Sequence, residues 1–208
     1  MGLTAVVFDL DGTLVETTPE GRYSIIGGVL RELGVSASPA DMDAFWFGTD
    51  RNQIVERRFG IVPQRFWEVY LRHDTVDTRG PYVRPYEDVA MVKSLKSIGY
   101  KTGIVSAVMR PLAELETGLI GHEHFDATVL ARTAEGSMPK PHPHALLECL
   151  KKLGVEPQSA VYVGNAEEDI LMAKAAGVLD VLIDRDEHPH KIEASFVIRS
   201  LYELLHVL

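Results

Sequence analysis

Cysteine is almost absent from this 208-residue sequence, which contains only Cys149. A single cysteine excludes a disulfide within the chain. It lies in HALLECLKKLG, where apolar residues recur with helical spacing, so we expect a buried helix residue rather than a reactive thiol. Long hydrophobic runs are also missing. No stretch approaches the roughly 18 apolar residues of a membrane span, and no basic, apolar leader opens the sequence. We therefore expect a cytoplasmic protein with no membrane partner.

Basic residues are scarce as well. The sequence has 21 Lys and Arg against 30 Asp and Glu, which gives a formal net charge of 21 − 30 = −9. Such a surface repels nucleic acid, and no basic run offsets it. Neither a GxxxxGK[ST] nor a GxGxxG phosphate loop is present, so nothing favours a nucleotide. A phosphate ester would be repelled at long range too, so an anion site needs a local positive patch or a bound cation. The sequence does not indicate an oligomeric state.

Short apolar runs alternate with helical patterns along much of the chain. Helical patterns that end in glycine separate these runs. This alternation predicts an α/β fold with a doubly wound, mainly parallel, Rossmann-like sheet, whose site lies at the carboxyl ends of the strands. The predicted strands are residues 4–10, 101–107, 160–165 and 178–184, with a weaker one at 127–132.

Residues 17–84 break this alternation, because they contain several helical patterns and no predicted strand. These helices could simply cover the sheet. A cap is the better interpretation, since the segment is longer than one crossover connection needs. The sequence thus predicts an α/β catalytic core from residues 1–16 and 85–208, with a helical cap domain at 17–84.

Two carboxylates follow the first predicted strand, in Phe8-Asp9-Leu10-Asp11-Gly12-Thr13-Leu14. Asp9 and Asp11 point the same way because side chains of an extended segment alternate. Such a pair can hold a hard cation, and one member can attack phosphorus. The alternative is a strand followed by an Asx-type turn. A calcium loop is excluded, because Thr13 and Leu14 stand where it needs Asp or Asn and then Gly.

Two further strand ends carry polar residues. Ser106 ends the strand GIVSA, and its hydroxyl could donate to a phosphoryl oxygen, although strand-end serines usually serve turns. In VGNAEED, Asn165 ends a strand and Asp169 follows four residues later, an arrangement that also suits an ordinary helix N-terminus. Lys140 lies between prolines in PKPHP, which stiffen the backbone of a lysine that must point inward. A solvated loop lysine is the alternative.

Together, DLDGTL, IVSA, KPHP and VGNAEED resemble the four motifs of the haloacid-dehalogenase-like superfamily, in its phosphoglycolate-phosphatase-like branch. The resemblance spans nearly the whole chain and implies a magnesium-dependent phosphatase. By position, it implies Asp9 as the nucleophile and Asp11 as the acid and base. Ser106 and Lys140 are the implied phosphoryl-binding residues.

The resemblance also implies a site for Mg²⁺ at the Asp9 carboxylate, the Asp11 carbonyl and the Asn165 side chain. Asp169 or Glu168 could complete that site through a bridging water, since Mg²⁺ commonly keeps several waters. The implied substrate is a small phosphorylated metabolite, such as a phosphoglycolate-like compound or a sugar phosphate.

The sequence departs from the family pattern at two positions. Ala107 replaces the usual Asn of the second motif, and Asn165 replaces the usual Asp metal ligand, so the metal site loses one negative charge. A sugar-phosphate mutase and a non-catalytic, phosphate-binding regulatory protein remain open. A dehalogenase is disfavoured by Asp11, and a phosphonate hydrolase by the absence of lysine from residues 17–84. Arg51, Arg57 and Arg58 are candidate substrate contacts in the cap.

Overall fold

The computed structural model describes residues 2–208, which form two compact units. One unit contains the chain up to Glu16 and again from Arg84 to the C-terminus, and the other is Thr17–Val83. That the second unit acts as a cap stays a prediction. No helix among residues 2–208 is long and apolar enough to cross a membrane.

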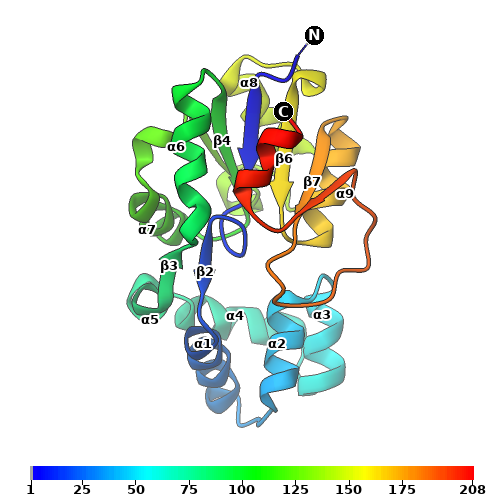
Figure 1. Cartoon of the computed structure of the whole chain (residues 1–208). Helices are drawn as coiled ribbons and strands as arrows, with labels where there is room; N and C mark the ends of the chain where they lie inside the picture. Colours follow the sequence, from blue (N-terminus) through cyan, green and yellow to red (C-terminus); the bar gives the residue numbers. More distant parts are fainter. Residues whose placement is uncertain (1) are drawn as a thin grey trace. The chain divides into compact units, whose positions relative to one another are not determined.

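The larger unit is built on one six-stranded sheet in the order β5-β4-β1-β6-β7-β8 (Figure 1). Every neighbouring pair of strands is parallel, which confirms the predicted α/β class with its mainly parallel sheet. The strand β8, only three residues long, was not predicted. The strands are β1 (Ala5–Phe8), β4 (Lys101–Ser106), β5 (Ala127–Leu130), β6 (Ala160–Gly164), β7 (Leu179–Ile183) and β8 (Phe196–Ile198).

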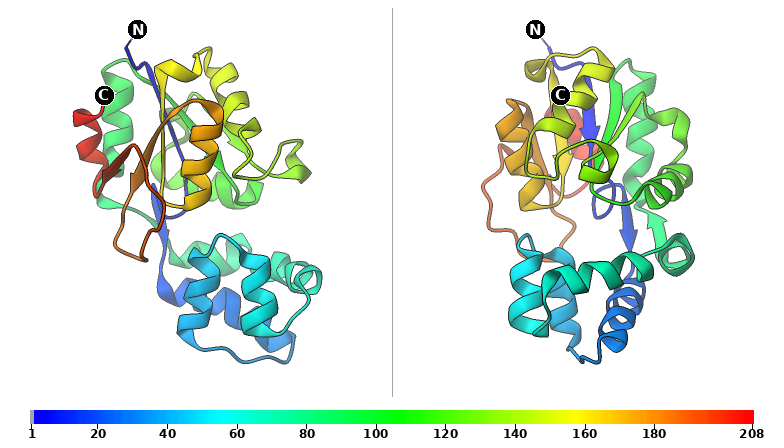
Figure 2. Two further views of the ribbon diagram at one scale, coloured as in Figure 1. Left: turned by 90° about the vertical axis from the view of Figure 1, so that its right-hand side faces the viewer. Right: turned by 180° about the vertical axis from the view of Figure 1, so that it is seen from behind.

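Helices cover both faces of this sheet. In the left view of Figure 2, α6 and the C-terminal segment lie on one side of the strands, and α8 and α9 lie on the other. Alternation along β1 divides the core accordingly, because Val6 and Phe8 pack into one apolar cluster while Ala5 and Val7 pack into the other. The helices are α6 (Ala90–Ser97), α7 (Arg110–Ile120), α8 (His144–Leu153) and α9 (Glu167–Ala176).

The ends of α8 and α9 follow the glycine signals in the sequence. Gly154 and Gly177 adopt left-handed φ angles of +63° and +69° directly after these helices, a conformation that glycine accepts without strain. Cys149 lies fully buried in α8, and burial raises the pKa of its thiol to about 12. The prediction of a buried helix cysteine is thus confirmed.

The smaller unit is helical and has its own aromatic core. Phe45, Phe59, Phe66 and Tyr70 pack together there, with Trp67 partly buried against them. Two short strands, β2 (Val15–Thr17) and β3 (Val83–Pro85), pair where the chain enters and leaves this segment, where no strand was predicted. The helices are α1 (Pro19–Glu32), α2 (Pro39–Phe47), α3 (Arg51–Ile54), which continues as a π-helix over Val55–Phe59, α4 (Pro63–His73) and α5 (Val76–Arg79).

Candidate active site

Three of the predicted site residues stand at the ends of adjacent strands. Asp9 follows β1 directly, Ser106 is the last residue of β4, and Asn165 is the first residue after β6. Because β1 lies between β4 and β6 in a parallel sheet, all three meet at one edge. The backbone N–H of Asp9 donates to the Val163 carbonyl at 2.9 Å, which fixes its level beside β6.

The loop after Asp9 is packed directly against Asn165. Gly12 has a φ of +85°, and its N–H donates to the Val15 carbonyl at 2.7 Å. A Cβ at this position would lie 2.1 Å from the Asn165 Nδ2 atom, so both the conformation and the space require glycine. The Thr13 hydroxyl also donates to Asn165 Oδ1 at 3.3 Å. The first and fourth motifs therefore meet as closely packed neighbours.

Lys140 lies between two buried carboxylates. Its Nζ atom donates to Asp9 Oδ1 at 2.6 Å and to Asp169 Oδ1 at 2.7 Å. The Lys140 side chain is only 3% exposed, and those of Asp9 and Asp169 are 10% and 1% exposed. Three charged groups in so little water cost several kcal/mol of desolvation each unless they compensate one another. Packing alone does not require a buried lysine between two buried carboxylates, so this arrangement points to a functional role.

The charges of this triad shift the pKa values of its members. Burial raises the pKa of Asp9 to about 7, although Lys140 opposes the shift. Burial alone would lower the pKa of Lys140, but the carboxylates of Asp169 and Asp9 outweigh it and raise that pKa above its ordinary value. Lys140 is therefore a buried cation at neutral pH. It therefore provides a local positive charge for an anion in a chain whose net charge is negative.

Asp11 and Ser106 belong to segments that end at the same edge of the sheet as Asp9. The negative charge of Asp11 contributes to the raised pKa of Asp9, as expected for two carboxylates at one strand end. Ser106 is 1% exposed, and its Oγ atom accepts a hydrogen bond from the Val108 N–H at 3.3 Å. The turn role considered for Ser106 is thus present, and it leaves the hydroxyl proton available to another acceptor.

The chemistry of these residues suits a hard cation. Carboxylate, amide and backbone oxygens are the donors that Mg²⁺ takes, and the raised pKa of buried Asp9 is what a neighbouring cation would relieve. Within residues 2–208, no three His, Cys, Asp or Glu side chains are gathered as a metal cluster. Asn165 supplies an amide oxygen at this edge, and the Asp169 carboxylate accepts a hydrogen bond from Lys140.

Comparison with known proteins identifies the family of the chain. Residues 6–183 match the family of haloacid dehalogenase-like hydrolases. The chain belongs to this family. A phosphoglycolate phosphatase of Neisseria meningitidis is 30% identical, covering 85% of this chain and 78% of that protein. The pyrophosphatase PpaX of Halalkalibacterium halodurans is 27% identical over 100% of this chain and 98% of its own length.

The fold of this family member also matches solved structures. A haloacid dehalogenase-superfamily hydrolase, subfamily IA, from Geobacter sulfurreducens superposes with a TM-score of 0.77 and 21% identity, covering all of both chains. The predicted family and hydrolase class are confirmed. The roles of Asp9, Asp11, Ser106 and Lys140, and the metal ligands, stay predictions, because these likenesses concern whole chains.

Tyr162 belongs to the site and was not predicted. It lies in the middle of β6, fully buried, and its hydroxyl is 3.0 Å from Asp169 Oδ1 and 3.2 Å from the Val105 carbonyl. Lys140 Nζ lies 5.7 Å from the centre of its ring. In the sequence AVYVGN, the aromatic residue looks like an ordinary core residue, and no local pattern shows that its hydroxyl meets a carboxylate.

Arg185, two residues after β7, holds the first loop in place and was also missed. Its guanidinium donates to the Thr13 carbonyl at 2.6 Å and to both oxygens of Asp88, at 2.7 and 3.0 Å. It also stacks on the Tyr86 ring at 3.9 Å from the centroid. Asp88 further accepts from the Leu201 N–H at 2.8 Å. These contacts join distant parts of the chain, so sequence spacing does not indicate them.

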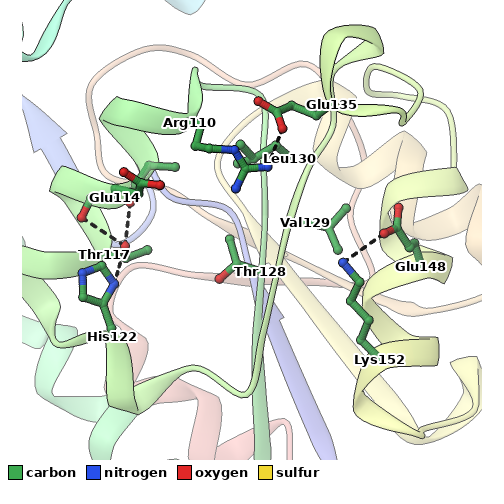
Figure 3. Close-up of a pocket in the computed structure, with 11 residues that line it drawn as sticks. Arg110, Glu114, Thr117, His122, Thr128, Val129, Leu130, Glu135, Glu148 and Lys152 are labelled. Atoms are coloured by element: carbon green, nitrogen blue, oxygen red, sulfur yellow. Dashed lines mark hydrogen bonds and ion pairs between the residues drawn. The ribbon is translucent and has the colours of Figure 1, made fainter.

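A separate hollow of about 220 Å³ lies along the edge strand β5, between α7 and α8 (Figure 3). Arg110 and Glu135 form an ion pair at one end, and Lys152 pairs with Glu148 at 3.0 Å at the other. None of the predicted site residues lines it, so it is distinct from the candidate active site.

Two of the candidate substrate arginines have structural partners within the helical unit. Arg51 donates to the carbonyls of Trp46 and Gly48 at 3.1 and 3.3 Å, and Arg58 pairs with Asp41 at 2.9 Å. These three contacts occupy part of each guanidinium. Their contact with a substrate stays a prediction.

Proposed function

We propose that this protein is a magnesium-dependent phosphomonoesterase that acts on a small organic phosphate through an aspartyl-phosphate intermediate. The observation that carries the proposal is the buried contact of Lys140 Nζ with Asp9 Oδ1 at 2.6 Å, at the carboxyl edge of the sheet. A lysine there neutralises the charge that gathers when a carboxylate approaches a phosphate. The named relatives, a phosphoglycolate phosphatase and a pyrophosphatase, both act on small phosphates, in keeping with this reading.

In the first step, an Asp9 oxygen attacks phosphorus, and the bond between phosphorus and the leaving oxygen breaks. Asp11 gives its proton to that oxygen, so the alcohol leaves neutral. In the second step, Asp11 takes a proton from water, which attacks the same phosphorus and releases phosphate from Asp9. Ser106 and Lys140 hold the phosphoryl oxygens throughout. Positioning and charge neutralisation supply most of the catalysis in such transfers.

Magnesium would be held by the Asp9 carboxylate, the Asp11 carbonyl and the Asn165 side chain, with Asp169 acting through a bridging water. Bound there, it would supply two positive charges next to the transferring phosphoryl group. The Asp169 carboxylate already accepts hydrogen bonds from Lys140 and Tyr162, which is why a water-bridged role suits it better than direct coordination. With Lys140, the site would concentrate three positive charges in a chain whose formal charge is −9.

We assign substrate choice to residues 17–84, acting as a cap, and we place the reaction in the cytoplasm. A phosphoglycolate-like compound or a sugar phosphate suits the proposed chemistry. The relatives' names leave pyrophosphate open as well, so the panel of substrates must include all three classes.

The test is hydrolysis of para-nitrophenyl phosphate and of phosphoglycolate, hexose phosphates and pyrophosphate by purified protein, with and without Mg²⁺. We expect magnesium-dependent release of phosphate, and loss of nearly all turnover in Asp9→Asn. Conversion of hexose 1-phosphate to hexose 6-phosphate without phosphate release would indicate the mutase instead. No turnover of any ester at saturating Mg²⁺ would refute the proposal and favour the non-catalytic regulatory reading, for which Asn165 is the supporting observation.

A further inference from the structure

The hydroxyl of Tyr162 has one proton and two acceptors within reach. Asp169 Oδ1 lies at 3.0 Å and the Val105 carbonyl at 3.2 Å. A hydrogen bond to an ionised acceptor is roughly twice as strong as one to a neutral acceptor. The nearer, charged oxygen therefore takes the proton, and Tyr162 donates to Asp169.

Packing accounts for the ring of Tyr162 but not for its hydroxyl. The residue is fully buried in the apolar cluster between the sheet, α8 and α9. A phenylalanine would fill nearly the same volume without a polar group to bury, and burying an unbonded hydroxyl is unfavourable. The hydroxyl is therefore explained by its hydrogen bond to Asp169, the carboxylate that also contacts Lys140.

Because Lys140 donates to Asp169, the other hydrogen bonds to the Asp169 carboxylate influence the position of the Lys140 ammonium. Asp169 Oδ1 accepts from both Lys140 and Tyr162, and Oδ2 accepts from the Ala166 N–H at 3.0 Å. Lys140 Nζ lies almost equally far from its two carboxylates, at 2.6 Å from Asp9 and 2.7 Å from Asp169. Donation from Tyr162 offsets part of the charge on Asp169, and so weakens its hold on the ammonium.

We propose that Tyr162 is a positioning residue, whose hydroxyl keeps Lys140 shared between Asp169 and the nucleophile Asp9. Without the hydroxyl, Asp169 attracts Lys140 more strongly, and the ammonium moves away from Asp9 and the phosphoryl site. The inference rests on the proposed phosphatase function only for its kinetic consequence. The placement of Lys140 can be observed in the protein without any turnover.

The kinetic test uses Tyr162→Phe with para-nitrophenyl phosphate. We expect kcat to fall about tenfold, which corresponds to about 1.4 kcal/mol, with KM unchanged within about twofold. In an Asp169→Asn background, Tyr162→Phe should change kcat by less than about twofold, because the hydroxyl acts through the carboxylate. Val161→Ala is the matched control. It removes buried methyl groups from the same strand on the opposite face, and should lower stability while leaving kcat within about twofold.

The structural test is a crystal structure of Tyr162→Phe, in which Lys140 Nζ should lie closer to Asp169 and farther from Asp9 than in the wild type. An unmoved Lys140 overturns the inference, whether or not the wild type is active. A kcat of Tyr162→Phe within about twofold of wild type also overturns it, as does an equal fall of kcat in Val161→Ala. An inactive wild type with a displaced Lys140 in the variant would refute the phosphatase proposal while supporting the positioning role.

Discussion

Replacing Lys140 by methionine should destabilise the protein far more than the loss of a surface ion pair does. Methionine keeps the length and apolar stem of the side chain but leaves Asp9 and Asp169 buried without their shared cation. Breaking a buried pair by removing one partner costs about 3–5 kcal/mol of unfolding free energy. The two carboxylates are 10% and 1% exposed, so water can do little to replace the ammonium.

A matched control is available on the surface. Lys96 pairs with Asp126 at 2.7 Å, with the side chains 35% and 37% exposed. Lys96→Met should lower the free energy of unfolding by less than about 1 kcal/mol, because exposed pairs contribute little. Urea unfolding of both variants in a metal chelator, near neutral pH, gives the comparison directly.

The deficit of Lys140→Met should also depend on pH in a defined direction. Burial already raises the pKa of Asp9 to about 7, and without Lys140 the pKa rises further. A folded state that holds a proton on Asp9 where the unfolded chain has released it gains stability as pH falls. The deficit should therefore shrink as pH falls from about 9 toward about 7, below which Asp9 is protonated in the folded wild type as well. A loss no greater than that of Lys96→Met, or one that grows as pH falls, would refute the buried triad as the reason for these contacts.

Three further predictions concern the metal, the first loop and the acid. Asn165→Asp should tighten Mg²⁺ binding about ten- to a hundredfold, or about 1–3 kcal/mol, in calorimetric titration, and unchanged affinity would mean that its charge is irrelevant. Burial alone would raise the pKa of Asp88, but hydrogen bonds from Arg185 hold it below the ordinary range. Asp88→Asn should thus lower the free energy of unfolding in urea by about 3 kcal/mol at neutral pH. The loss should be smaller below about pH 4, where the wild type loses this stabilisation, and a loss that does not depend on pH would contradict the prediction. Asp11→Asn should slow an alkyl phosphate more than para-nitrophenyl phosphate, and equal losses would count against proton transfer.

The sheet could be predicted because its strands are β-branched, apolar runs with helical patterns between them. The carboxyl ends of parallel strands lie at one edge of a sheet. This rule alone was enough to predict that Asp9, Ser106 and Asn165, from three distant segments, lie at the same edge. The glycines after α8 and α9 marked the helix ends for a local reason, since left-handed φ angles suit glycine.

What could not be predicted depends on contacts between segments far apart in the chain. Lys140 contacts Asp169, and Asp169 in turn contacts Tyr162. Both contacts depend on the directions of the side chains, which the spacing of residues in the sequence does not indicate. The same holds for Arg185, which reaches the Thr13 carbonyl from beyond β7. The strand β8 could not be predicted because three residues are too few to show an alternation of apolar and polar side chains.

The central claim is that Asp9 carries the phosphoryl group during turnover. Rapid mixing of the wild type with a ³²P-labelled substrate and Mg²⁺, quenched in acid, should give labelled protein, and peptide mapping should place the acid-stable label on Asp9. Asp9→Asn, prepared and quenched in parallel, should carry no label. Label on another residue, or turnover by Asp9→Asn close to that of the wild type, would contradict the account.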